Sequence, residues 1–200
     1  MTDSLSAVSG PIARLARELE TISGQGLLDR AFVRSAEPAM RRLLAEGNFL
    51  PEEAMQPSEK GYARHLLYRD PEGRFSIAAM VWQPGQGTPI HDHDGTWGMI
   101  GMVQGGLEVV NYFSDDRDVR PGDVSLRRDA PHTPRAGTAE CVCGCADIHV
   151  VKNRSDEMAI SLHVYARDLE KCLVFDPVSE KDGRFFAHEK TLAYTTDASS

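Results

Sequence analysis

The amino-acid sequence predicts a mainly β fold, a small barrel or jelly roll, with helices at its N-terminal end. Short β-prone runs alternate with turn-forming residues through the middle of the chain, which is typical of β-sandwiches and small barrels. The runs cover residues 75–81, 96–103, 107–113 and 148–152, and turn residues cluster at 70–73, 104–106 and 120–123. Apolar residues at helical spacing precede this region, before residue 50.

The N-terminal helices are predicted from apolar residues spaced three and four positions apart. In the stretch 11–22 these residues are Ile12, Leu15, Leu19 and Ile22. The stretches 27–33 and 38–45 continue the pattern, which ends at Gly47. We expect these helices to pack outside the barrel or at its mouth, as scaffold.

Length and charge limit the class of protein. A chain of 200 residues is long enough for one domain with a sizeable core. We expect a helical part at 1–50, a barrel core at 60–177 and an irregular tail at 178–200. The net charge of −8, from 22 basic and 30 acidic residues without a basic run, argues against nucleic acid or an anionic membrane as partner.

The start of the chain and its apolar content predict the location. Residues 1–10 lack the charged-then-apolar plan of a signal peptide, and no apolar run approaches the length of a membrane span. We therefore expect a cytoplasmic protein, either a monomer or a weak homo-oligomer. Four cysteines fit reduced thiols there: Cys141, Cys143, Cys145 and Cys172. The first three lack the paired spacing of structural zinc sites, so we expect unligated thiols.

A pair of histidines predicts a metal site. His91 and His93 are separated by one residue and would lie on the same face of a strand, within reach of one ion. Together with Gly85 and Gly105 they resemble the first cupin motif at every fixed position but one. Gly98 stands where that motif has a Glu, so the usual carboxylate ligand is missing.

Two residues compete for the third ligand. His132 lies between prolines in 129–134, which favours a loop. His149 lies in a strand-like run and has Asn153 four positions on, like the second cupin motif, which favours His149. Three neutral imidazoles leave a metal's charge uncompensated, so such a site invites an anionic ligand such as a thiolate.

A third feature is the run Ser161, His163 and Tyr165. In a strand these alternate residues point one way, and the apolar residues between them point the other. A hydroxyl, an imidazole and a phenol in line can hold the Tyr O–H and relay its proton. The alternative is an ordinary strand whose polar face meets water.

Taken together, these blocks resemble the cysteine dioxygenase family of thiol dioxygenases, a branch of the cupins, over about residues 62–177. The matching blocks are 62–67, His91 with His93, 147–149, 161–165 and 174–177. The resemblance implies one mononuclear non-haem iron(II) per chain, bound by His91, His93 and His149. It also implies an enzyme that adds both atoms of O2 to a small thiol to give a sulfinate.

The resemblance also assigns roles to side chains. Arg64 would bind the substrate carboxylate with its guanidinium fork, and Tyr62 would add a hydroxyl. Tyr165 would donate a hydrogen bond to the substrate sulfur or to bound oxygen, and His163 and Ser161 would hold it in place. The plainer alternative for Arg64 is a surface side chain paired with Asp or Glu. Trp97 could either wall the pocket or fill the core.

Two departures from the family pattern bear on chemistry and substrate. Animal members have a Cys at the position of Gly98 that links covalently to the relay Tyr, so Tyr165 should be unmodified here. The mercaptopropionate-oxidising branch tends to have Gln and Arg where this chain has Arg64 and Val174. Cysteine is therefore favoured, while 3-mercaptopropionate and mercaptosuccinate stay open.

Two other functions fit parts of the pattern. A non-catalytic metal-binding cupin or small-molecule sensor would show no thiol-dependent O2 uptake. A cupin isomerase or decarboxylase usually needs the Glu that Gly98 replaces.

Overall fold

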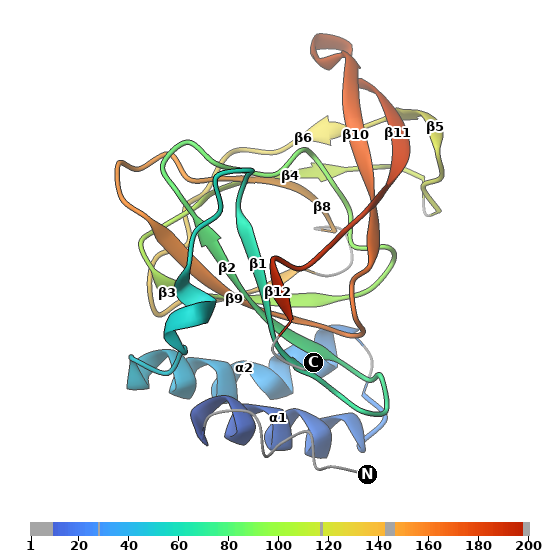
Figure 1. The fold of residues 1–200 in the computed structure, drawn as a ribbon. Coiled ribbons are helices and arrows are strands. Elements are labelled where there is room, and N and C mark those ends of the chain that lie inside the picture. Colours follow the sequence, from blue (N-terminus) through green and yellow to red (C-terminus); the bar gives the residue numbers. More distant parts are fainter. Residues whose placement is uncertain (1–9, 28, 117, 143–146, 198–200) are drawn as a thin grey trace.

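The computed structural model describes residues 10–27, 29–116, 118–142 and 147–197. Within these ranges two α-helices, α1 (Gly10–Ser23) and α2 (Asp29–Glu46), precede the strands and lie together along one side of them (Figure 1). Two short 3₁₀ helices, η2 (Glu52–Met55) and η4 (Glu180–Asp182), complete the helical part. No helix in the described ranges combines the length and apolar character needed to span a membrane.

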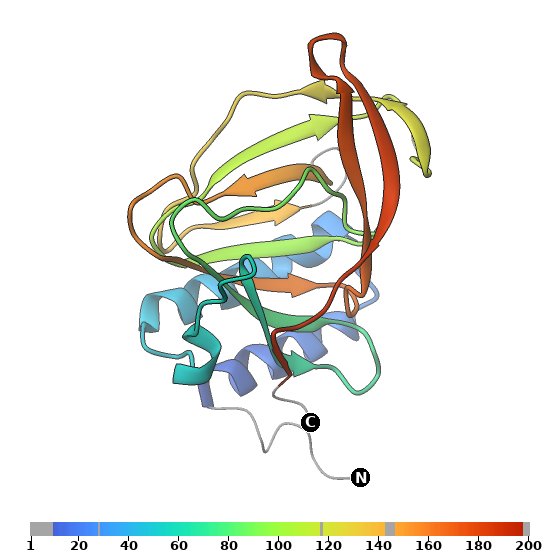
Figure 2. The ribbon, with the colours of Figure 1, turned by 45° about the horizontal axis from the view of Figure 1, so that its top comes forward.

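The strands form three sheets arranged around a common interior (Figure 2). The largest has the order β12 (Thr196–Asp197), β1 (Ala63–Arg69), β2 (Ser76–Trp82), β9 (Ala159–Tyr165), β3 (Gly98–Gln104), β7 (Ala139–Val142). A second consists of β10 (Lys171–Ser179), β11 (Arg184–Thr191) and β5 (Gly122–Ser125). The third consists of β6 (Arg127–Arg128), β4 (Glu108–Phe113) and β8 (Ile148–Lys152). These elements confirm the predicted mainly β class with N-terminal helices.

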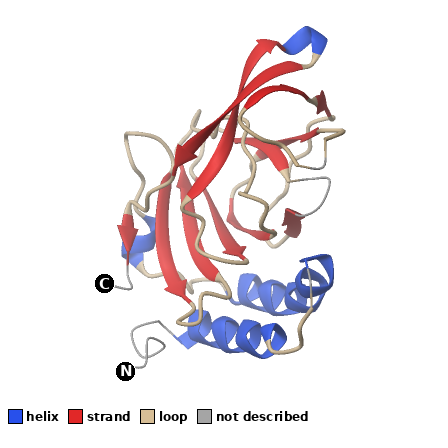
Figure 3. Cartoon of the chain, turned by 90° about the vertical axis from the view of Figure 1, so that its right-hand side faces the viewer, coloured by secondary structure: helices blue, strands red, loops and turns tan. Residues whose placement is uncertain are grey.

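The helices cover the outer face of the six-stranded sheet, as Figure 3 shows from the side. Their apolar faces and the outward residues of β1, β2 and β9 form one buried cluster. The contact between α2 and β3 is close at Gly101, where an added Cβ would lie 2.8 Å from Met40 Sδ. The small residue is needed for that approach.

The two faces of strand β9 contact different parts of the molecule: the N-terminal helices on one side and the barrel interior on the other. Ile160, Leu162 and Val164 belong to the cluster beneath the helices. The alternate residues face the barrel interior, where Met80, Trp82 and other apolar side chains form a second cluster. The predicted alternation of this strand is therefore confirmed, and its polar face is buried rather than wet.

The predicted boundaries at the N-terminus need one correction. The stretches 27–33 and 38–45 form the single helix α2, which continues through Pro38. Proline lacks one amide donor and disfavours a helix interior. Here the buried face of Phe32, Ala36 and Met40 runs across it and packs on the sheet, which outweighs that cost.

The prediction of an irregular tail at 178–200 is wrong for its described part. β11 pairs along its whole length with β10, and β12 pairs with β1. Phe185 and Ala187 are buried in a third cluster while Phe186 between them is exposed, which is the alternation of a strand. Flanking charged residues conceal this short pattern in the sequence.

Candidate metal centre and substrate cavity

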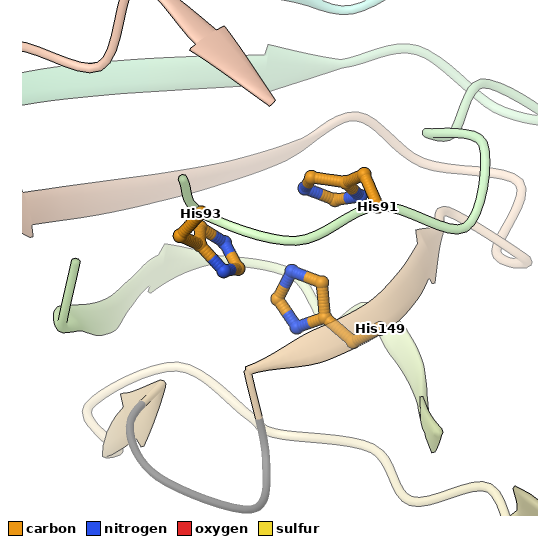
Figure 4. Close-up of side chains that lie close together, drawn as sticks. All are labelled: His91, His93 and His149. Atoms are coloured by element: carbon orange, nitrogen blue, oxygen red, sulfur yellow. The ribbon is translucent and has the colours of Figure 1, made fainter. Parts of the chain in front are cut away.

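Three histidines converge from two parts of the chain (Figure 4). His149 lies on β8, and His91 and His93 lie on the segment before β3. That segment is not the regular strand that was predicted: His91 forms isolated bridges to His149 and to Val174. The backbone amides and carbonyls of His91 and His149 bond reciprocally at 2.9 Å, which sets the two rings side by side.

The rings offer free nitrogens to a common point. One ring nitrogen from each residue lies within 4.8 Å of the others. Nδ1 of His93 donates to the Asp147 carbonyl at 2.9 Å, and Nδ1 of His91 donates to the Pro89 carbonyl at 3.1 Å. The second nitrogen of each of these two imidazoles therefore keeps an unshared lone pair for a ligand.

The electrostatic setting also suits a cation. Burial and the neighbouring imidazoles lower the pKa of His91 to about 3, and that of His149 well below its ordinary value. The rings of His91 and His149 are thus neutral near pH 7, the form that binds metals. The competing residue His132 lies outside this group and bonds Glu140 Oε2 at 3.0 Å.

Ser161, His163 and Tyr165 form a continuous hydrogen-bonded relay. Ser161 Oγ lies 2.8 Å from Nε2 of His163, and Tyr165 Oη lies 2.9 Å from its Nδ1. All three residues are buried. The polar face predicted for β9 therefore assembles as expected.

The sequence did not predict a fourth member of this relay. The Trp82 indole N–H donates to Ser161 Oγ at 2.9 Å. Because an indole nitrogen can only donate, Ser161 Oγ accepts there. Ser161 is buried, and His163 Nε2 is the acceptor within reach of its own hydrogen, so Ser161 donates to His163. With a neutral imidazole, Nδ1–H then donates to the Tyr165 oxygen.

This order leaves the phenol hydrogen of Tyr165 free for the cavity that the residue lines. Burial lowers the pKa of His163 to about 3, so the imidazole is neutral. Burial also raises the pKa of Tyr165 above its ordinary value of 10.0, so the phenol keeps its proton. The site therefore contains a directed O–H donor at neutral pH.

A small cavity adjoins the histidines and contains the predicted substrate residues. Its walls are formed by Tyr62, Arg64, Met80, Trp82, Thr88, His91, His149, Val151, His163, Tyr165, Leu169 and Leu192. The Tyr62 ring stacks on Trp82 with centroids 4.4 Å apart. Tyr62 and Arg64 thus line one cavity, as their spacing suggested.

Arg64 is a buried cation without an anion. It is 4% exposed, and Nη2 donates to the Leu169 carbonyl at 3.2 Å. Nη1 is the one buried side-chain nitrogen or oxygen of the described residues that lacks a hydrogen-bond partner. The alternative of a surface residue paired with Asp or Glu is therefore wrong. An unsatisfied buried guanidinium is costly unless a ligand pairs with it.

Two further residues singled out in the sequence are Gly98 and Trp97. Gly98 faces the relay, since an added Cβ would lie 3.2 Å from Cε1 of Tyr165. Trp97 packs on Phe32 of α2, with ring centroids 4.4 Å apart, as core filling. Gly98 has no sulfur to link to Tyr165, so the phenol has no partner here for a thioether.

The cysteines differ from one another. Cys172 is a buried free thiol. Cys141 is disulfide-bonded, so the prediction of a reduced thiol is wrong at this position. That prediction came from the overall character of the chain, which does not determine local geometry. Cys143 and Cys145 lie outside the described residues.

Comparison with known proteins identifies the family. The model of the family described as cysteine dioxygenase type I matches residues 44–178, more than half of the chain. This chain belongs to that family. Membership confirms the resemblance seen in the sequence and the prediction of a cupin fold.

The individual relatives have low sequence identity to this chain. The chain is 27% identical over 116 residues to cysteine dioxygenase type 1 of Danio rerio and of Homo sapiens. The match covers 58% of this chain and 56% of each relative, so the chain spans about half the length of the curated relatives it matches. A Klebsiella pneumoniae protein with a double-stranded β-helix domain is 15% identical, with a TM-score of 0.45, over 71% of this chain and 98% of its own.

Proposed function

We propose that this protein is an iron(II)-dependent thiol dioxygenase that converts a small carboxylate-bearing thiol to its sulfinic acid. One observation carries the proposal: the cavity that contains the unpaired buried guanidinium is also lined by His91 and His149, whose rings form one group with that of His93. The three rings suit a cation, and the guanidinium suits an anion placed a fixed distance from that cation. A small molecule with a thiolate at one end and a carboxylate at the other satisfies both.

Each group of residues would have a separate role in the reaction. His91, His93 and His149 would hold one iron(II), which supplies a Lewis-acidic, redox-active centre for a thiolate and dioxygen. Arg64 would bind and orient the substrate carboxylate. Tyr165 would donate its proton to the sulfur or to the oxygen, held in place by His163 and Ser161.

The residues of the cavity favour a substrate that carries a carboxylate, but they do not distinguish among the candidate acids. Cysteine, 3-mercaptopropionate and mercaptosuccinate all carry one, whereas cysteamine does not. Arg64 and Val174 stand where the mercaptopropionate-oxidising branch tends to have Gln and Arg, which supports cysteine. We propose cysteine as the preferred substrate, in a cytoplasmic enzyme.

The test is O2 uptake by anaerobically iron-loaded protein with these four thiols, with the sulfinate product identified by mass. The kcat/KM for cysteamine should be lower than that for the best acid by a factor of about 10² or more, because cysteamine leaves the buried guanidinium unpaired. Arg64→Ala should reduce that ratio by weakening the acids. Equal rates for cysteamine and cysteine on the wild type would disprove the substrate class. Absence of any thiol-dependent uptake would favour a non-catalytic cupin.

A further inference from the structure

The last described residues of the chain, 192–197, lie against the strand that carries Arg64 (Figure 1). The Thr195 amide donates to the Arg64 carbonyl at 2.6 Å, and the Arg64 amide donates to Thr195 Oγ1 at 3.1 Å. β12 then continues in parallel with β1, with Thr196 opposite His65. This segment therefore fixes the backbone at the position of the guanidinium-bearing residue.

A buried histidine strengthens the attachment. Nε2 of His65 donates to the Gln56 carbonyl at 2.8 Å, so in the neutral ring Nδ1 accepts. The Thr196 hydroxyl supplies that hydrogen at 2.7 Å. His65 is only 1% exposed, so the bond is shielded from competing water. The C-terminal segment is thus held in one register beside the cavity.

The same segment shapes the environment of the guanidinium. Cζ of Arg64 lies 4.6 Å from the centroid of the Tyr194 ring, a cation–π arrangement. Tyr194 Oη donates to Asp168 Oδ1 at 2.5 Å, and Asp168 Oδ2 accepts from Arg69 Nε at 2.7 Å. Asp168 is therefore engaged by Tyr194 and Arg69, and the Tyr194 ring gives Arg64 a contact without neutralising it.

Building on the proposed function, we propose that residues 192–197 complete the substrate site and that Tyr194 is the positioning residue for Arg64. The ring face holds the guanidinium so that its unpartnered Nη1 is presented to the substrate carboxylate. Leu192 forms part of the wall of the same cavity. The family match ends at residue 178, so this wall lies outside the matched region.

If Tyr194 positions Arg64, its loss should weaken only substrates that carry a carboxylate. Loss of the ring face frees the guanidinium to adopt other positions, which weakens pairing with a carboxylate. A thiol without a carboxylate does not use that pairing and is unaffected. A merely structural Tyr194 would instead change all substrates alike.

The experiment compares Tyr194→Leu, which removes the ring, with Tyr194→Phe, which keeps the ring and loses the bond to Asp168. Phe186→Leu is a matched control, because Phe186 is an exposed aromatic residue on β11. Anaerobic calorimetry on iron-loaded full-length protein gives the Kd for 3-mercaptopropionate and for cysteamine, and oxygen uptake gives KM and kcat. Tyr194→Leu should raise Kd and KM for the acid about tenfold with kcat and cysteamine binding unchanged. Tyr194→Phe keeps the ring face, so it should raise Kd for the acid much less than Tyr194→Leu does. Phe186→Leu should stay within about twofold of the wild type.

Several results would overturn the proposal. An unchanged Kd in Tyr194→Leu would remove the ring from the site, and an equal loss for cysteamine would make the role structural. Equal losses in the Leu and Phe variants would assign the effect to the Asp168 bond instead. Failure of the proposed function would be seen separately, as absence of thiol-dependent O2 uptake by the wild type, because the binding ratios need no turnover.

Discussion

Single hydrogen atoms decide what the relay can do. Ser161 and His163 can each donate or accept, so the relay alone has two possible directions. The Trp82 indole can only donate and occupies one acceptor position of Ser161, which favours the direction that leaves the Tyr165 hydrogen for the cavity. Trp82 also supports Tyr62 through ring stacking. One residue thus contacts both the relay and the cavity wall formed by Tyr62.

Trp82→Phe should therefore lower kcat while iron content stays unchanged. The phenyl ring keeps the stack on Tyr62, but Ser161 loses the donor that orients it. A lost hydrogen bond costs about 1 kcal/mol, which corresponds to roughly a fivefold fall in kcat. Tyr165→Phe should cost more, since it removes the donor itself. Steady-state kinetics and metal analysis measure both effects.

Trp97→Phe is the matched control, because that indole packs on Phe32 and not on the relay. Turnover of Trp82→Phe equal to that of Trp97→Phe and of the wild type would contradict the orienting role of the indole.

The sequence predicted residues whose types and spacing define the chemistry. His91, His93, His149 and the face of β9 follow from motifs and from strand periodicity. Trp82 and Tyr194 could not be found this way, because each acts through a partner distant in the chain: Ser161 and Arg64. Sequence spacing gives no information about such contacts.

At the scale of elements, the turn between β1 and β2 is fixed by one carboxylate. Both oxygens of Asp70 accept bonds from Arg74: Oδ2 from the backbone amide at 2.9 Å and from Nε at 2.7 Å, and Oδ1 from Nη2 at 2.7 Å. Burial alone would raise the pKa of Asp70, but the bonds from Arg74 outweigh it, so the pKa lies below 3.8. The turn holds together the two strands that contribute Arg64 and Trp82.

Asp70→Asn should lower the free energy of unfolding by about 1–3 kcal/mol at pH 7, because charge-assisted bonds to a buried carboxylate are lost. A lowered folded-state pKa gives stability that is present above the ordinary pKa and lost as the pH falls through the folded-state value. The difference between wild type and variant should therefore shrink as the pH falls below about 4. Urea unfolding at pH 7 and pH 3 measures it.

Asp118→Asn is the comparison for this turn, because Asp118 pairs with Arg120 on the surface. It should change stability little at either pH. Equal effects of the two substitutions would show that the Asp70 bonds do not hold the turn.

Elements were predictable where one periodicity dominates a long stretch, as in α1 and β9. They were not predictable where tertiary packing outweighs a local signal, as at Pro38 within α2. The C-terminal strands are a similar case, since β11 is defined by its pairing with β10 and β5 rather than by its composition.

At the scale of the whole molecule, the candidate ligands join segments that the sequence keeps apart. His149 belongs to β8, whereas His91 and His93 lie more than fifty residues earlier, before β3. His91 also bridges to Val174 of β10. An ion held by the three rings would link these parts of the barrel in the folded state. The unfolded chain has no preformed site, so binding should add directly to stability.

Metal binding should therefore raise Tm, and the rise should require all three histidines. At a free metal concentration 1,000 times Kd, mass action stabilises the fold by about 4 kcal/mol, or roughly 8–16 °C for a chain of this size. Scanning calorimetry of metal-free protein, with iron(II) added anaerobically and then removed by a chelator, measures the shift without any turnover.

His149→Ala should abolish the shift in Tm, since no protein carboxylate remains in the group to hold the ion. His132→Ala should keep it, because His132 pairs with Glu140 away from the three rings. If His132→Ala lost the shift and His149→Ala kept it, the third ligand would be His132 and the centre proposed here would be wrong.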